Sequence, residues 1–294
     1  MLIQTDQLPM ADHTDLRLAT PEGAVSSDRN HIVVLDPDHP GFSDQQYRVR
    51  RNQIAQLSLG YQPGEPIPEA PYTADEHNVW RAVWQALAPA HEAHACAEYL
   101  SCVKKLDFPR DRIPQLSEVN QRVEALSGFH LEPVAGLVEP RTFLDALASG
   151  TFLCTQYIRH HSTPLYTPEP DVIHELAGHA VTLASQRLAE LNRSFGRAVK
   201  RTKSPEAFDR LSRVYWFTIE FGVVLEEGQL KAYGAGLLSS AGELAAMCNS
   251  ELRPLDPEAA SAQGYDPTQY QKVLFCAESF DAMFQTIEEY LTAW

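Results

Sequence analysis

The stretch DVIHELAGHA, residues 171–180, pairs a histidine with a glutamate and adds a second histidine five positions after the first. Zinc proteases carry H-E-x-x-H, but here Gly178 stands where their second histidine would be. On an ideal α-helix, residues five apart lie about 140° apart around the axis, so His174 and His179 do not share a face. Both can reach one metal ion that lies beside the helix, and we expect Gly178 to leave room for that approach. A third ligand must come from another segment.

The stretch RVYWFTIEFGVV offers that ligand. Glu220 is surrounded by bulky apolar residues, and a carboxylate in such a place is costly to bury unless it is paired or binds a cation. Two imidazoles and one carboxylate form the triad typical of non-haem Fe(II) oxygen chemistry. Zinc hydrolysis is the alternative, with the same three ligands and Glu175 as base. Tyr215, Trp216 and Phe221 predict an aromatic pocket rather than an open peptidase cleft, which favours iron.

Composition narrows the class of protein. A net charge of −15 over 294 residues argues against a nucleic acid partner, which demands clustered Lys and Arg. Five dispersed cysteines without a CxxC pair indicate reduced thiols, and no run of 18 apolar residues exists to span a membrane. We therefore expect a cytoplasmic enzyme that acts on a small molecule.

The hydrophobic pattern predicts one mostly α-helical domain with a few short strands, over residues 31–294, after a tail at 1–30. Two segments read as strands, within 129–139 and 151–159. A helix is expected to begin near Ser43, and another is expected to be capped by Ser117 and to end at Gly128. Further helical patterns cover 74–106, 141–150, 181–198, 204–224, 239–250 and 277–292.

The chain resembles the pterin-dependent aromatic amino acid hydroxylases, and most closely those that act on phenylalanine. The resemblance is carried, in family order, by DHPGFSDQQYRVRR, CTQYIRHHSTPLYTPEPDVIHELAGH, YWFTIEFG, KAYGAGLLSSAGEL and AESF. It implies a mostly helical catalytic-domain fold that holds one Fe(II) through His174, His179 and Glu220. It also implies a reaction that uses tetrahydrobiopterin and O₂.

The resemblance further implies which residues bind the small molecules. Arg159 would hold the amino acid carboxylate through two parallel hydrogen bonds, assisted by Thr167 and Ser239. The substrate ring would lie among Trp216, Pro170 and the face of His174. The pterin contacts would be Gly136, Val138, Phe143 (by stacking), Glu175 and Tyr215.

The sequence also departs from the family pattern. HAVTLASQRLAEL, after the second histidine, lacks the usual proline and reads as one longer unbroken helix, and Leu153 stands where many relatives carry a histidine. Attack at the para carbon of phenylalanine, giving tyrosine, is the default expectation. The alternatives are attack at the meta carbon, a tryptophan hydroxylase, and a binding protein that kept the fold without activity. Because no sustained heptad repeat follows the last helix, we expect a monomer.

Overall fold

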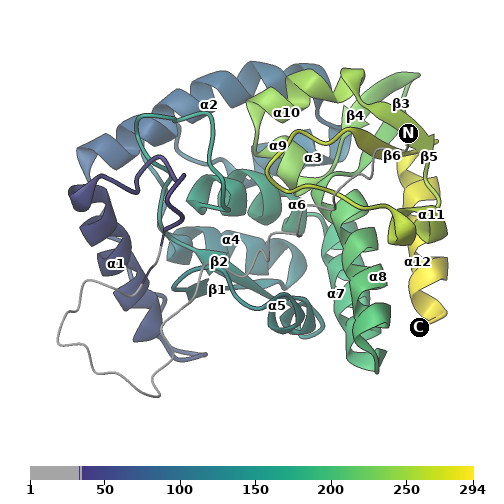
Figure 1. Ribbon diagram of the computed structural model, residues 1–294, viewed down its shortest axis with the longest axis horizontal. Coiled ribbons are helices and arrows are strands. Elements are labelled where there is room, and N and C mark those ends of the chain that lie inside the picture. The colour runs from purple at the N-terminus through teal and green to yellow at the C-terminus, as the bar shows by residue number, and fades with distance from the viewer. Residues whose placement is uncertain (1–32, 34) are drawn as a thin grey trace, which may run out of the picture.

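A computed structural model describes residue 33 and residues 35–294, so the predicted tail at 1–30 lies outside the described residues and its boundary stays a prediction. The α-helices are α1 (Gln45–Leu59), α2 (Ala74–His94), α3 (Ala97–Leu106), α4 (Leu116–Ser127), α5 (Pro140–Leu147), α6 (Val181–Leu183), α7 (Gln186–Arg201), α8 (Pro205–Tyr215), α9 (Ala235–Leu238), α10 (Ala241–Ala246), α11 (Pro257–Ala262) and α12 (Phe280–Thr292). Two π-helical turns, η1 (His174–Ala180) and η2 (Trp216–Glu220), and a 3₁₀ turn, η3 (Met247–Asn249), complete the helical segments. The mostly helical fold with short strands is confirmed (Figure 1).

The strands form two small sheets. β1 (His130–Val134) and β2 (Thr151–Thr155) pair in parallel, and each lies in one of the two segments that were expected to form a strand. The second sheet has the order β4-β3-β6-β5 and contains β3 (Val223–Glu226), β4 (Gln229–Ala232), β5 (Glu251–Pro254) and β6 (Val273–Ala277). A two-residue turn joins β3 to β4, and both of its residues, Glu227 and Gly228, have positive φ.

Several predicted helix limits were wrong for identifiable reasons. The 74–106 pattern is two helices, because the chain turns at Ala95 and the amide of Cys96 donates to Ala232 of β4. Ser117 does not cap α4, which begins at Leu116. The expected unbroken helix after His179 is interrupted too, since Ser185 caps α7 by accepting a hydrogen bond from the amide of Leu188.

Three other predicted helices also differ from the structure. The helix expected at 204–224 gives way to η2 and β3, the one at 239–250 breaks into shorter turns, and the last begins at Phe280 rather than 277. The stop at Gly128 is confirmed, where φ is +69°. The start near Ser43 lies one residue early, because Asp44 caps α1.

The largest hydrophobic cluster of the described residues runs from Val79 on α2 to Leu291 on α12, so helices from both ends of the sequence share one core. In Figure 1, α2 lies along one side of the molecule, and α7, α8 and α12 stand together on another side, near the second sheet. Among the described residues, no helix has the length and apolar character needed to cross a membrane.

Gly178 marks a close approach within this core. A Cβ added there would lie 2.7 Å from the backbone oxygen of Ala235 on α9, a contact too short to keep. The glycine therefore serves the packing of η1 against α9, rather than the approach of the imidazoles to a metal that the sequence suggested.

We expect Gly178→Ala to lower the free energy of unfolding. Overpacking against backbone costs about 1–3 kcal/mol, which exceeds the gain of up to about 1 kcal/mol from alanine's helix propensity. Urea titration measures the difference. Gly264→Ala is the control, because a Cβ there meets nothing within 4 Å. Equal stability of the two variants would contradict the packing argument.

Candidate metal centre and active site

The π-helical winding of η1 brings His174 and His179 together despite their five-residue spacing. Hydrogen bonds in a π-helix link residues five apart, so residues i and i+5 lie above one another rather than on different faces. His174 opens η1 and His179 lies near its end, and their ring centroids are 4.7 Å apart with the two Nε2 atoms separated by 2.9 Å. The local winding of the helix thus turns the unusual spacing into a convergent pair.

Glu220 completes the group from the end of η2. Its Oε1 lies 3.0 Å from Nε2 of His179, and its Oε2 lies 3.7 Å from Nε2 of His174. Ligands at right angles around an ion, with bonds of about 2.1 Å, lie roughly 3 Å apart. The donor set and most of its spacing therefore fit a divalent metal bound on one face, with the other positions open.

The electrostatics of the three groups also fit a cation. Burial, together with His179, lowers the pKa of His174 to about 4, so this imidazole stays neutral. Although burial opposes ionisation, the two histidines hold the pKa of Glu220 below its ordinary value. The charge of Glu220 raises the pKa of His179 despite burial. A metal bound to these two groups would compete with a proton for the same ligand atoms.

Ser239, predicted to assist Arg159 in binding the substrate, contacts His174, and its substrate contact stays a prediction. Its Oγ lies 2.9 Å from Nδ1 of His174, and it donates to the carbonyl of Gly236 at 3.1 Å. The hydroxyl therefore accepts a hydrogen bond from Nδ1–H of His174, which fixes the tautomer with Nε2 free for a metal.

Arg159 lies in the loop after β2 and is buried in an ion pair with Asp171. Its Nε and Nη2 atoms donate to the two carboxylate oxygens at 2.9 and 2.8 Å. One edge of the guanidinium is therefore occupied by Asp171, and Nη1 also donates to the carbonyl of Pro164 at 3.5 Å. The substrate contact of Arg159 stays a prediction. Asp171 also accepts from the amide of His174 at 3.2 Å, so one carboxylate orients both Arg159 and the first ligand.

Two other predicted substrate contacts, Thr167 and Pro170, lie in the same loop. The hydroxyl of Thr167 donates to the carbonyl of Glu169 at 2.9 Å, and Pro170 accepts from the hydroxyl of Tyr157 at 2.5 Å. These bonds hold the loop in shape, and a direct substrate contact by either residue stays a prediction.

Trp216 opens η2 and lies in an aromatic wall. Its ring stacks on Tyr265 with centroids 4.1 Å apart, and Phe221 packs against it at 4.6 Å. Its indole nitrogen donates to Oε1 of Gln271 at 3.1 Å. The loop that carries Tyr265 and Gln271 also lines a groove of about 450 Å³. The expected aromatic surroundings are therefore present.

The predicted pterin contacts lie on α5, α8 and η1 and in the loop between β1 and α5. Phe143 on α5 meets Tyr215 edge to face, with ring centroids 6.1 Å apart. Phe152 lies between Phe143 and His179, with its ring centroid 5.2 Å from that of Phe143 and 4.5 Å from that of His179. The hydroxyl of Tyr215 is bound to Asn192, so its ring rather than its hydroxyl faces Phe143. Two further predicted contacts lie in the loop between β1 and α5, namely Gly136, which is buried, and Val138, which is half-buried.

Glu175 lies beside this group and is buried on η1. It accepts from the amide and the hydroxyl of Thr155 at 3.2 and 3.0 Å, and burial raises the pKa of Glu175 to about 7. A carboxyl group held in this way by β2 can take up or release a proton near neutral pH.

Four contributing residues were missed from the sequence, and only one left a local signal. Asp171 precedes His174 by three positions, as a helix cap does. Thr155, Tyr265 and Gln271 act through contacts between distant segments, which spacing cannot reveal.

The chain belongs to the biopterin-dependent aromatic amino acid hydroxylase family, because the family model of that description matches residues 28–293. It is 45% identical over 272 residues to human tyrosine 3-monooxygenase, covering 89% of this chain and 51% of that protein. It is 44% identical over 254 residues to human phenylalanine-4-hydroxylase, covering 84% and 56%. The chain thus spans about half the length of these relatives.

Solved structures agree with this assignment. Phenylalanine hydroxylase from Legionella pneumophila superposes with a TM-score of 0.70 at 32% identity, covering 75% of this chain and 87% of that one. Phenylalanine hydroxylase from Chromobacterium violaceum, with bound iron(III) and 7,8-dihydrobiopterin, gives 0.72 at 27% identity, covering 81% and 90%. The expected catalytic-domain fold is confirmed.

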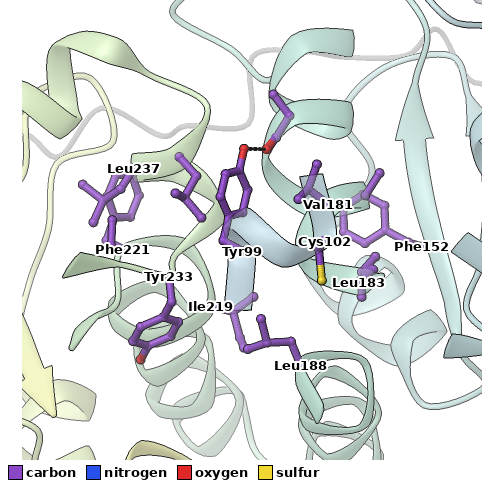
Figure 2. Packing of buried hydrophobic residues seen from close by; sticks show 14 of the residues in the cluster. Tyr99, Cys102, Phe152, Val181, Leu183, Leu188, Ile219, Phe221, Tyr233 and Leu237 are labelled. Atoms are coloured by element: carbon purple, nitrogen blue, oxygen red, sulfur yellow. Dashed lines mark hydrogen bonds between the residues drawn. The ribbon is translucent and has the colours of Figure 1, made fainter. Parts of the chain in front are cut away.

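Tyr99 on α3 holds η1 from the core side and generates a prediction. Its buried hydroxyl donates to the carbonyl of Ala177, between the two histidines, at 2.7 Å (Figure 2). Loss of one such bond costs about 1 kcal/mol, so we expect Tyr99→Phe to weaken Co²⁺ binding about fivefold. Tyr72→Phe is the matched control, because Tyr72 makes a 2.7 Å bond of the same kind to Gln156. Titration followed by cobalt absorbance measures both, and equal affinities would show that Tyr99 does not position η1.

Proposed function

We propose that this chain is an iron- and tetrahydropterin-dependent monooxygenase that hydroxylates L-phenylalanine at the para carbon to give L-tyrosine. The observation that carries the proposal is the convergence of His174, His179 and Glu220 on one face of a metal position. Membership of the family and the iron and dihydrobiopterin in the C. violaceum neighbour support it.

Bound iron and reduced pterin would together supply the activation of O₂, and the chain's own residues prepare the place. His174, His179 and Glu220 would hold the metal from one side, and Ser239 keeps His174 in the tautomer that leaves Nε2 free. Glu175, fixed by Thr155, would orient the pterin and hold a proton at its carboxyl oxygen. This buried role is unlike that of a hydrolytic base facing water, so the zinc hydrolase alternative receives no support.

Arg159 would recognise the carboxylate of the amino acid. Its guanidinium is fixed by Asp171, so a substrate carboxylate meets a rigid donor edge rather than a flexible side chain. Charge-assisted hydrogen bonds of this kind contribute about 1.5–3 kcal/mol. The ion pair lowers the conformational entropy cost of using Arg159 in binding.

The aromatic wall would bind the ring. Trp216, held by stacking on Tyr265 and by Gln271, gives a flat apolar surface that suits an unsubstituted phenyl ring. Tyrosine is a second candidate substrate, because tyrosine 3-monooxygenases match at the same level of identity as phenylalanine hydroxylases. We further propose a cytoplasmic enzyme, on the basis of its charge and cysteines, and one that acts as a monomer.

Product analysis tests the proposal. The iron-loaded protein, given tetrahydrobiopterin and O₂, is expected to convert phenylalanine to para-tyrosine as the main product, resolved from the ortho and meta isomers by chromatography. Faster conversion of tyrosine or tryptophan would change the substrate, and a meta product would change the ring position. No oxygen uptake with any aromatic amino acid would refute the activity.

Arg159→Lys tests the carboxylate site without stranding the buried Asp171. Lysine keeps a positive charge for the ion pair but has no second edge for the substrate. We expect KM for phenylalanine to rise about 10- to 100-fold while the iron content is retained. Arg50→Lys is the control, because Arg50 forms the same two-bond pair with Glu76 at 2.9 and 3.1 Å. An unchanged KM in Arg159→Lys would remove this arginine from the substrate site.

A further inference from the structure

Among the described residues, a second group of metal-ligating side chains lies where α1 begins and the loop after β2 passes it. Asp44, His160 and His161 each offer one ligand atom, and these atoms lie within 4.8 Å of one another. We propose that they bind a second divalent cation, best matched by Zn²⁺, independently of the catalytic metal.

Hydrogen bonds already hold the side chains of Asp44 and His160 in position. Oδ2 of Asp44 lies 3.2 Å from Nε2 of His160, while Oδ1 accepts from the amide of Tyr47 at 3.0 Å and holds the carboxylate in place. Nδ1 of His160 lies 2.7 Å from Oγ of Ser162 and accepts a hydrogen bond from the amide of Ser162 at 3.3 Å. Ser162 thus holds the ring from its Nδ1 side and leaves Nε2 facing Asp44. A cation would then replace the proton between His160 and Asp44.

Of the two histidines, His160 is buried and His161 is exposed to solvent. His160 is only 6% exposed, and its ring is held at the edge of Tyr47 with centroids 4.9 Å apart. His161 is exposed, with its ring centroid 4.3 Å from that of His160, so it can rotate to close on an ion that enters from solvent. Two imidazoles and a carboxylate suit Zn²⁺, with water in the remaining position.

The structural alternative is that Asp44 and His160 form only a helix cap with an ion pair. That role needs no contribution from His161, so His161 decides between the two readings. Because His161 is exposed, His161→Ala leaves the core unchanged. A loss of zinc binding in this variant would therefore not be the result of misfolding.

The test is equilibrium dialysis of the iron-loaded protein against Zn²⁺, with both metals quantified. We expect one zinc per chain in addition to the retained iron, and at least a tenfold weaker zinc affinity in His161→Ala. Asp44→Asn keeps an oxygen for the α1 cap but removes the charge, and it should also weaken binding. His130→Ala is the control, because it also removes a histidine beside a carboxylate, 3.9 Å from Glu124, but one that is not part of the proposed site.

Two results would overturn the second site. One is zinc that enters only as iron leaves, because the catalytic ligands would then account for all of it. The other is equal zinc affinity in His161→Ala and the unchanged protein.

Discussion

The buried carboxylate of Asp171 is the constraint on which the site depends. Its side chain is fully buried, and a charge in such a place must be paired to be tolerated. Arg159 and the amide of His174 at the start of η1 both meet this need, so one carboxylate fixes the proposed contact for the amino acid and the first candidate metal ligand. Removal of Asp171 would therefore disturb the positions of Arg159 and His174 together.

The two π-helical turns also depend on contacts with the residues around them. A π-helical turn is a rare conformation that requires support from its surroundings. η1 is held by Tyr99 on one side and by the close approach of Gly178 to α9 on another. η2 is followed by Gly222, whose amide donates to the carbonyl of Thr218. The core thus stabilises local geometry that an isolated helix would not adopt.

Much of this could be predicted from the sequence, and the failures have a common cause. Local patterns predicted the helical class, β1, β2 and the stop at Gly128, and the H-E-x-x-x-H spacing with Glu220 predicted the ligand set. The spacing could not reveal η1, because winding depends on the packing around it. Nor could it show that Asp171 occupies one edge of Arg159, since that pair forms across a loop. Two of the four strands in the second sheet, β4 and β5, lay wholly in stretches without a predicted strand or helix, because each is short and depends on the strand beside it in the sheet.

The parallel pairing of β3 with β6 has a consequence for biosynthesis. β3 follows Glu220 closely, and Val223 of β3 pairs with Cys276 of β6. β4 follows β3 directly and can pair with it at once, but β3 gains its second neighbour, β6, only after the chain has been synthesised through residue 277. Until then the nascent chain offers the two histidines without their carboxylate partner fixed in place. A metal ion that needs all three ligands is therefore expected to bind only after β6 has joined the sheet.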